Sequence, residues 1–273
     1  MGEGERPKAP SSAAPLVRES FHRHEPDEPL LQAYFKNLYH RTMDEAYGLA
    51  FDRVAAALRE GGQVLDCGAN TGGSLSRLQS LVDLESTRYQ GIEWNAECVR
   101  AAQAKGLNVI QGDLNRPLPF ESEQFRCVFG LSVLEHLLNG CAFMKECHRV
   151  LEPNGTLVLL TPNISTFFTI ALLLVGKMPS SGPHPDSNAL LAGEELFKVS
   201  STDLVHDTES ETPMHRHLVV FSFRVLRRYL SMLGFAEVKG YGFGLYPFPH
   251  FLQPGLEKLD PYHCHQMVFL AKK

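Results

Sequence analysis

The segment Val64-Leu65-Asp66-Cys67-Gly68-Ala69-Asn70-Thr71-Gly72-Gly73 decides the fold of this chain. An apolar run reaches an acidic residue, continues through spaced glycines and leads into an amphipathic stretch at residues 75–82. This order predicts a β-strand, a tight turn and the start of a helix. In an α/β sheet, such a turn is the usual place for a nucleotide-like cofactor.

The glycine spacing indicates which kind of cofactor to expect. Dinucleotide-binding turns carry G-x-G-x-x-G, in which bare backbone approaches a pyrophosphate. Here the order is D-x-G-x-x-x-G-G, with Asp66 two residues before the first glycine. An acidic side chain at that place repels a diphosphate and attracts a cation. We therefore expect a ligand that carries an amino group, with its adenosine beyond the turn, and a nucleotide-dependent oxidoreductase is disfavoured.

Composition indicates one globular domain in a reducing compartment. The 273 residues are 44% hydrophobic and 21% charged, with a net charge of −5, which suits a single α/β domain. No block of Lys and Arg is present, so we expect no nucleic-acid partner. The six cysteines lack C-x-x-C or zinc-ligand spacing. Cys67 and Cys127 lie within apolar strand patterns and are expected to be buried free thiols.

Two segments bear on location. Residues 1–27 are expected to form a disordered tail, because residues 2–15 are rich in Pro, Ala, Ser and charge and contain no apolar signal region. The apolar run at residues 167–175 is too short to span a bilayer. We therefore expect a cytoplasmic protein without stable membrane insertion, whose domain comprises residues 28–273.

Short strand patterns alternate with helical patterns along most of the chain. The predicted strands are 64–67, 89–93, 107–111, 125–131, 156–160, 235–239 and 267–271, and the predicted helices are 29–58, 74–82, 96–105, 133–150 and 222–233. This alternation predicts a parallel sheet with helices on both faces. Ligands of such sheets bind at the carboxyl ends of the strands.

Residues 164–217 interrupt this alternation. They contain the apolar run, a stretch rich in Pro, Gly and Ser, and a polar segment. A long irregular segment inside a compact domain is usually functional or partly disordered. We expect an inserted lid that covers the acceptor. The aromatic segment 241–251 is expected to pack as core or lid, or to line the acceptor pocket.

Polar residues follow four of the predicted strands. Glu93 comes about twenty residues after the glycine turn, where a carboxylate can accept hydrogen bonds from both ribose hydroxyls. Asp113 is placed to accept from an adenine amino group, and Leu131-Ser132-Val133-Leu134-Glu135-His136 follows the fourth strand. Each acid alone could cap a helix or a turn. Three carboxylates at successive strand ends favour a binding site.

The turn at residues 66–73 resembles motif I of the class I methyltransferases that use S-adenosylmethionine (SAM). H-R-V-L-E-P-N-G-T at residues 148–156 and T-P-N at 161–163 resemble the type 11 methyltransferase family, as does the segment from His215 to Phe235. The resemblance covers about residues 40–163 and 215–273. It implies a Rossmann-like fold with a seven-stranded, mostly parallel sheet, helices on both faces and an antiparallel last strand.

The resemblance also implies how SAM lies. Asp66 and the glycine turn would approach the methionine portion, Glu93 the ribose, and Asp113 with Leu114 the adenine. The predicted cofactor-binding residues are Asp66, Gly68, Ala69, Asn70, Thr71, Gly72, Glu93, Trp94, Asp113, Leu114, Leu131 and Ser132.

Catalytic residues are harder to predict, because methyl transfer needs little beyond alignment, desolvation and removal of a proton. His136, His215 and His217 are the candidate bases, although each could instead have a structural or solvent-facing role. His263-Cys264-His265 could chelate a metal, but no further ligand has recognisable spacing, so no metal is expected.

The predicted function is methyl transfer from SAM to a small, apolar or amphipathic acceptor. The alternative is a non-catalytic SAM-binding or scaffolding domain of the same fold. The methyl acceptor, the attacking atom and the oligomeric state are left open by the sequence.

Overall fold

The computed structural model describes residues 30–179, 181–187 and 216–273. They form one seven-stranded sheet in the order β3-β2-β1-β4-β5-β7-β6. The strands are β1 (Val64–Cys67), β2 (Tyr89–Glu93), β3 (Val109–Gln111), β4 (Phe125–Leu131), β5 (Leu151–Pro162), β6 (Glu237–Phe243) and β7 (Gln266–Lys272). Strands β1 to β5 are parallel, and β7 is antiparallel to both of its neighbours. The predicted Rossmann-like sheet with an antiparallel last strand is therefore confirmed.

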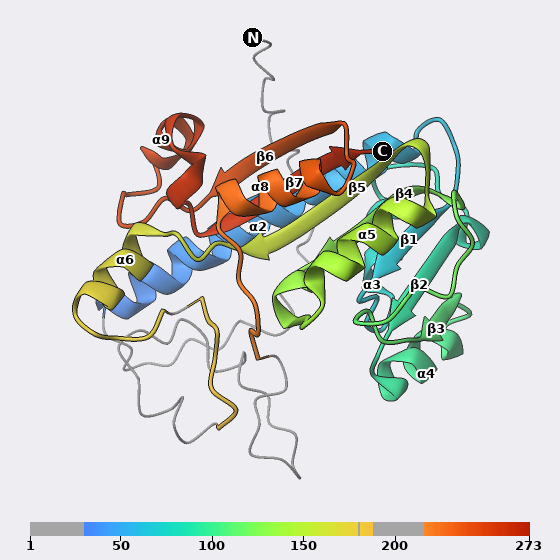
Figure 1. Cartoon of the computed structure of the whole chain (residues 1–273), viewed down its shortest axis with the longest axis horizontal. Coiled ribbons are helices and arrows are strands. Elements are labelled where there is room, and N and C mark those ends of the chain that lie inside the picture. The colour runs from blue at the N-terminus through green and yellow to red at the C-terminus, as the bar shows by residue number, and fades with distance from the viewer. Residues whose placement is uncertain (1–29, 180, 188–215) are drawn as a thin grey trace.

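Helices cover both faces of the sheet (Figure 1). The helices are α2 (Leu30–Leu58), α3 (Gly73–Gln79), α4 (Ala96–Ala104), α5 (Gly140–Val150), α6 (Phe167–Leu174), α8 (Phe223–Met232) and α9 (Gln253–Leu259), and the short 3₁₀ helices are η1 (Ser86–Arg88), η2 (Leu134–His136) and η4 (Pro261–His263). Helices α5 and α8 pack with one face of the strands, while α2, α3 and α4 pack with the other. Buried residues therefore run continuously along each central strand, as expected of a sheet covered on both sides.

The central strands place Asp66 in the middle of the sheet, where it is paired with Gly91 of β2 and Phe129 of β4. In Figure 1 the parallel strands end at the same edge, and α6 and residues 216–222 lie at the β5 side of that edge. The carboxyl ends of the strands thus bring together the polar groups that the sequence places far apart.

Several boundaries were predicted wrongly. The strand predicted at residues 156–160 begins at Leu151, and the helix predicted at residues 133–150 is η2 followed by the separate helix α5. The pattern predicted a strand at residues 235–239, but β6 runs from Glu237 to Phe243 and includes the start of the aromatic segment. The sequence pattern did not extend the strand to Phe243 because β6 contains Gly240 and Gly242, and glycine usually weakens a strand pattern. Gly240 is required by close packing: a Cβ there would lie 2.5 Å from the Phe223 ring and 2.7 Å from that of Phe269.

The predicted burial of Cys67 and Cys127 is confirmed, and none of the six cysteines, all of which lie in the described part of the chain, forms a disulfide bond. The apolar run forms α6, and none of the described helices is long and apolar enough to cross a membrane.

Candidate active site

The glycine turn after β1 is held against two neighbouring strand ends. Gly68 has a φ of +86°, and a Cβ on it would lie 2.5 Å from Cγ2 of Val133, which follows β4. The N–H groups of Gly68 and Ala69 both donate to the carbonyl oxygen of Ile92, at 2.8 and 3.2 Å. Only glycine allows this conformation and this close approach without strain. The turn is therefore fixed between β2 and the segment that follows β4.

Asp66 is a buried acid directly before this turn. The hydroxyl group of Tyr89 donates to its Oδ2 at 2.6 Å, and Ser74 also bonds its carboxyl group. Burial raises the pKa of Asp66 to about 6, against the lowering effect of these two bonds, and the nearby Glu93 raises it further. A positive ligand group beside Asp66 would offset the cost of this buried charge.

Glu93 ends β2 and joins two loops. Its Oε2 accepts the backbone N–H of Asn70 at 3.0 Å, and its Oε1 accepts that of Asn95 at 2.9 Å. Asn95 in turn caps α4. Each carboxylate oxygen can accept a second hydrogen bond. Glu93 is thus fixed in orientation and retains the capacity to bind two hydroxyl groups.

The end of β3 continues this edge. The N–H of Gly112 donates to the carbonyl oxygen of Glu93 at 2.9 Å. Asp113 follows, and its Oδ1 accepts the N–H of Asn115 at 2.9 Å. Leu114 is buried in the core, whereas Trp94 is 70% exposed beside the ends of β2 and β3. An apolar side chain, an acid and an exposed ring therefore occur together where the adenine was predicted.

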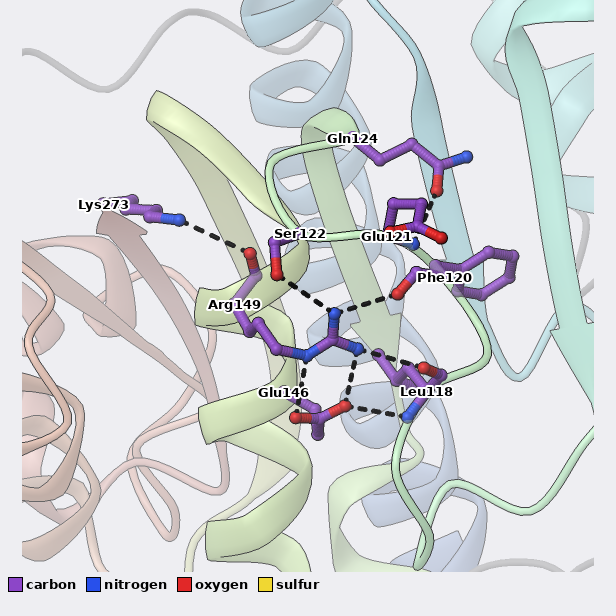
Figure 2. Close-up of polar contacts among 8 residues, drawn as sticks. All are labelled: Leu118, Phe120, Glu121, Ser122, Gln124, Glu146, Arg149 and Lys273. Carbon is purple, nitrogen blue, oxygen red and sulfur yellow. Dashed lines mark hydrogen bonds and ion pairs between the residues drawn. The ribbon is translucent and has the colours of Figure 1, made fainter.

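The loop after β3 is anchored to α5 by Arg149, as Figure 2 shows. The Arg149 guanidinium group donates to both carboxylate oxygens of Glu146, at 3.0 and 2.8 Å, and to the carbonyl oxygens of Phe120 and Leu118, at 2.9 and 3.0 Å. Glu146 also accepts the N–H of Leu118 at 2.9 Å. This cluster holds the loop that begins with Asp113.

Tyr47 of α2 is a site residue that the sequence did not reveal. Its hydroxyl group donates to Oγ of Ser132 at 3.1 Å, and Ser132 has a φ of +55°. Burial raises the pKa of Tyr47, and Glu135 and Asp66 raise it further. Both carboxylates therefore lie within electrostatic reach of this phenol. From the sequence, Tyr47 is only one residue of the helix predicted at residues 29–58.

A second polar group lies beyond β4, in and around η2. Glu135 is 2% exposed, and its Oε2 accepts a hydrogen bond from Oγ1 of Thr161 at 2.9 Å. The rings of His136 and His217 are 5.2 Å apart. The N–H of Leu218 donates to the carbonyl oxygen of Glu135 at 2.7 Å and so fixes the returning chain beside η2. The structure thus brings together two of the three predicted histidines; His215 lies outside the described residues.

Two further histidines belong to this neighbourhood. His184 stacks on His217 with ring centroids 4.7 Å apart, and His265 contributes electrostatically to His217. Burial lowers the pKa of His136, His217 and His265, to about 3 for His217 and about 4 for His265. Neutral imidazoles with such low pKa values are weak proton acceptors near pH 7, but they retain a nitrogen lone pair.

The start of the aromatic segment 241–251 packs in the core, whereas Phe248 and Phe251 are 38% and 79% exposed. Phe243 is buried, and Tyr241 lies in β6 beneath the guanidinium group of Arg53. Tyr246 shares a 2.6 Å hydrogen bond with Thr42, and its ring centroid lies 5.4 Å from that of His265. The segment was predicted to pack as core or lid, or to line the acceptor pocket. Tyr241 and Phe243 pack in the core.

The residues at the strand ends fit SAM chemically. Asp66 and Glu93 are buried acids, and within the described residues no Lys or Arg forms a salt bridge with either. SAM carries an ammonium group, a positively charged sulfur and a ribose with two hydroxyl groups. Carboxylates stabilise such groups, whereas they would repel a diphosphate. These two carboxylates therefore suit SAM and do not suit NAD.

A family model described as a methyltransferase domain matches residues 39–239. The chain belongs to the class I SAM-dependent methyltransferase family, whose cofactor is SAM. This confirms the class and the cofactor predicted from motif I.

Curated relatives support this membership over part of their length. The chain is 30% identical over 152 residues to a ubiquinone biosynthesis O-methyltransferase of Methylocella silvestris, a match that spans 54% of this chain and 57% of that protein. It is 27% identical over 206 residues to a probable phthiotriol/phenolphthiotriol dimycocerosates methyltransferase of Mycobacterium ulcerans, covering 72% of this chain and 70% of the relative.

Solved structures support the fold. A SAM-dependent methyltransferase of Thermotoga maritima, described as a possible histamine N-methyltransferase, matches with a TM-score of 0.50 and 17% identity over 89% of this chain and 98% of that one. A phosphoethanolamine N-methyltransferase of Haemonchus contortus in complex with SAM also has a TM-score of 0.50, with 13% identity over 78% of this chain and 49% of that one. At these identities the likeness concerns the fold alone.

Proposed function

We propose that this protein transfers the methyl group of SAM to an oxygen atom of a small amphipathic acceptor. The observation that carries the proposal is the order of groups along the carboxyl edge of the sheet. Acids suited to the cofactor lie at β1, at the end of β2 and after β3. A separate polar group follows β4 and consists of the buried Glu135 with the partly buried His136 and His217.

Each part of this edge has a task in the proposed reaction. SAM, when bound, supplies a methyl group on a positively charged sulfur. Asp66 and Glu93 hold the amino and ribose groups, and the adenine lies beside Asp113 and Leu114. The acceptor hydroxyl faces the group formed by Glu135, His136 and His217, which orients its oxygen, and its proton passes to water. Alignment and exclusion of water then account for most of the rate.

The apolar part of the acceptor is supported by α6. This helix begins just after β5, and Ile170, Leu173, Leu174 and Val175 expose 43–83% of their surface. An apolar patch of this kind commonly marks a binding surface. We propose that residues 164–217 cover the acceptor. Hydrogen bonds hold the chain at both ends of this segment. The N–H of Ile164 donates to the carbonyl oxygen of Phe221, and the N–H of Leu218, the residue after the segment, donates to the carbonyl oxygen of Glu135.

The name of one relative supports an oxygen acceptor. One is named as an O-methyltransferase of ubiquinone biosynthesis, and the other is named for phthiotriol and phenolphthiotriol dimycocerosates. Both names denote lipid-like molecules, which agrees with the apolar surface of α6.

The test is methyl transfer from SAM with an isotopically labelled methyl group to a panel of hydroxylated quinones, phenols and long-chain alcohols. We expect mass spectrometry to detect a labelled methyl ether and demethylated SAM in equal amounts with at least one compound. The same compound with its hydroxyl already methylated serves as the control and should give no product. Turnover confined to amines or thiols would contradict the oxygen assignment. SAM binding without any transfer would favour the scaffolding alternative.

A further inference from the structure

We infer that Glu135, His136 and His217 bind one divalent transition-metal cation beside the carboxyl end of β4. One ligand atom from each residue can be chosen so that all three lie within 4.8 Å of one another. A tetrahedral ion with bonds of about 2.1 Å holds its ligand atoms about 3.4 Å apart. Side-chain rotations that move each ligand atom by about 1 Å would therefore bring the three atoms to the spacing that the ion requires.

The hydrogen bonds of both imidazoles select the tautomer that a metal requires. Nδ1 of His136 lies 3.1 Å from the carbonyl oxygen of Arg216, and Nδ1 of His217 lies 2.6 Å from that of Ser181. Because a carbonyl oxygen can only accept, Nδ1 of each neutral ring carries the proton and Nε2 carries the lone pair. Metal-binding histidines typically donate their other ring N–H to a backbone carbonyl or a carboxylate in this way.

Glu135 supplies the negative charge that a cation would offset. Its side chain is buried, and Thr161 is a neutral donor to it. Within the described part of the chain, no Lys or Arg forms a salt bridge with Glu135. Buried carboxylates are normally paired with a positive group or coordinate a metal. A divalent cation between Glu135 and the two imidazoles provides that charge.

The backbone holds the three ligands in place before any metal arrives. The N–H of Leu218 donates to the carbonyl oxygen of Glu135, which fastens the segment after His217 to η2. The N–H of His184 donates to the carbonyl oxygen of His217 at 2.9 Å, and the two rings stack. His217 is therefore held from both sides. Sites whose ligands are fixed by surrounding contacts bind metals with less loss of entropy.

Ser181 adds a further polar atom beside His217. Its hydroxyl oxygen is buried and has no hydrogen-bond partner among the described residues. Buried hydroxyl groups without a partner are uncommon and costly. A water molecule or an acceptor group bound to the cation would offer the Ser181 hydroxyl a hydrogen-bond partner.

The ligand set indicates which cations to expect. Two imidazoles with one carboxylate suit Zn²⁺, Mn²⁺, Fe²⁺ or Co²⁺, whereas Mg²⁺ and Ca²⁺ prefer oxygen ligands. Three protein ligands also leave a coordination position open, as in catalytic metal sites. The sequence predicts no metal, since Glu135 and His217 are 82 residues apart and share no local ligand spacing.

The use of the cation in catalysis rests on the proposed function, although metal binding itself does not. A hydroxyl oxygen bound to the cation loses its proton more readily, and that proton passes to water. The oxygen then forms a bond to the methyl carbon while the carbon–sulfur bond breaks and its electron pair stays on sulfur. The open coordination position would thus hold the acceptor oxygen during the transfer.

The test measures metal binding in the full chain without SAM or acceptor. After removal of metal with a chelator, Zn²⁺ and Mn²⁺ are titrated separately by calorimetry, and bound Mn²⁺ is followed by electron paramagnetic resonance. We expect one ion per chain. His136→Gln and His217→Gln should each weaken binding at least tenfold. Absence of saturable one-to-one binding of either ion, or unchanged affinity in both variants, would overturn the inference.

Two controls separate loss of the site from loss of the fold. His148→Gln removes an imidazole from the last turn of α5, which leads into the amino end of β5, and should leave metal affinity unchanged. SAM affinity measured without metal should stay within threefold in all three variants, because none of these histidines is placed in the cofactor site. Methyl transfer that persists in a variant that no longer binds the metal would overturn the catalytic use of the cation and leave the proposed function standing.

Discussion

Replacing Glu93 by alanine is expected to weaken SAM binding at least tenfold. The change removes the carboxylate proposed to accept both ribose hydroxyls, and hydrogen bonds to charged groups are worth roughly 1.5–3 kcal/mol. It also removes the acceptor for the N–H groups of Asn70 and Asn95, so the two loops beside the cofactor lose their common anchor. Calorimetric titration of SAM into wild type and variant measures the loss directly.

The matched control is Glu97→Ala. Glu97 lies in the first turn of α4, and its side chain is 86% exposed beside Arg100. Exposed ion pairs of this kind contribute little to the free energy of unfolding. The Glu97→Ala variant should therefore stay folded and bind SAM as the wild type does. An unchanged dissociation constant in Glu93→Ala, with an unaltered circular dichroism spectrum, would remove Glu93 from the cofactor site.

Arg149→Ala is expected to lower the free energy of unfolding by about 2–3 kcal/mol, the scale of lost charge-assisted hydrogen bonds that leave partly buried acceptors unpaired. The acceptors are the carboxylate of Glu146 and the carbonyl oxygens of Leu118 and Phe120 (Figure 2). The Arg149 side chain is 34% exposed and that of Glu146 is 20% exposed, so water replaces only part of these bonds. Urea denaturation followed by circular dichroism measures the difference.

Arg100→Ala provides the comparison for this effect. Arg100 and Glu97 are also an i,i+3 pair on a helix, but their side chains are 69% and 86% exposed and 3.8 Å apart. Its removal should change the free energy of unfolding by no more than about 0.5 kcal/mol. Equal effects of the two substitutions would show that the Arg149 cluster does not anchor the loop after β3.

The cofactor-binding residues at the carboxyl ends of β1, β2 and β3 could be predicted from the sequence because the patterns that mark them are local. Asp66 and the glycine turn are contiguous, and Glu93 and Asp113 each follow a short strand pattern. Parallel strands that alternate with helices must bring their carboxyl ends to one edge. The structure adds how these groups are held, such as the bonds from Tyr89 to Asp66 and from Asn70 to Glu93.

The region after β4 could be predicted only in part. His136 and His217 were recognised as isolated histidines, but their proximity depends on how residues 216–222 return to η2. Tyr47 falls within the helix predicted at residues 29–58, and nothing local points to its contact with Ser132, which is 85 residues away in the chain. Pairings over such separations leave no periodic signal in a single sequence.

The extent of β6 was missed for a related reason. A local pattern registers Gly240 and Gly242 as the end of a strand, whereas packing explains both. The Phe223 and Phe269 rings occupy the space beside Gly240, and the carbonyl oxygen of Pro261 and the Cys264 side chain occupy that beside Gly242. These neighbours come from three other segments of the chain.

Calorimetric titration of the purified chain with SAM, with its demethylated product and with NAD tests the central claim most directly. The acids at β1 and β2 and the glycine spacing predict that SAM and its product each bind one molecule per chain with dissociation constants in the micromolar range. They predict no binding of NAD, whose diphosphate would lie against Asp66. Binding of NAD without binding of SAM would contradict the assignment of this edge as a SAM site.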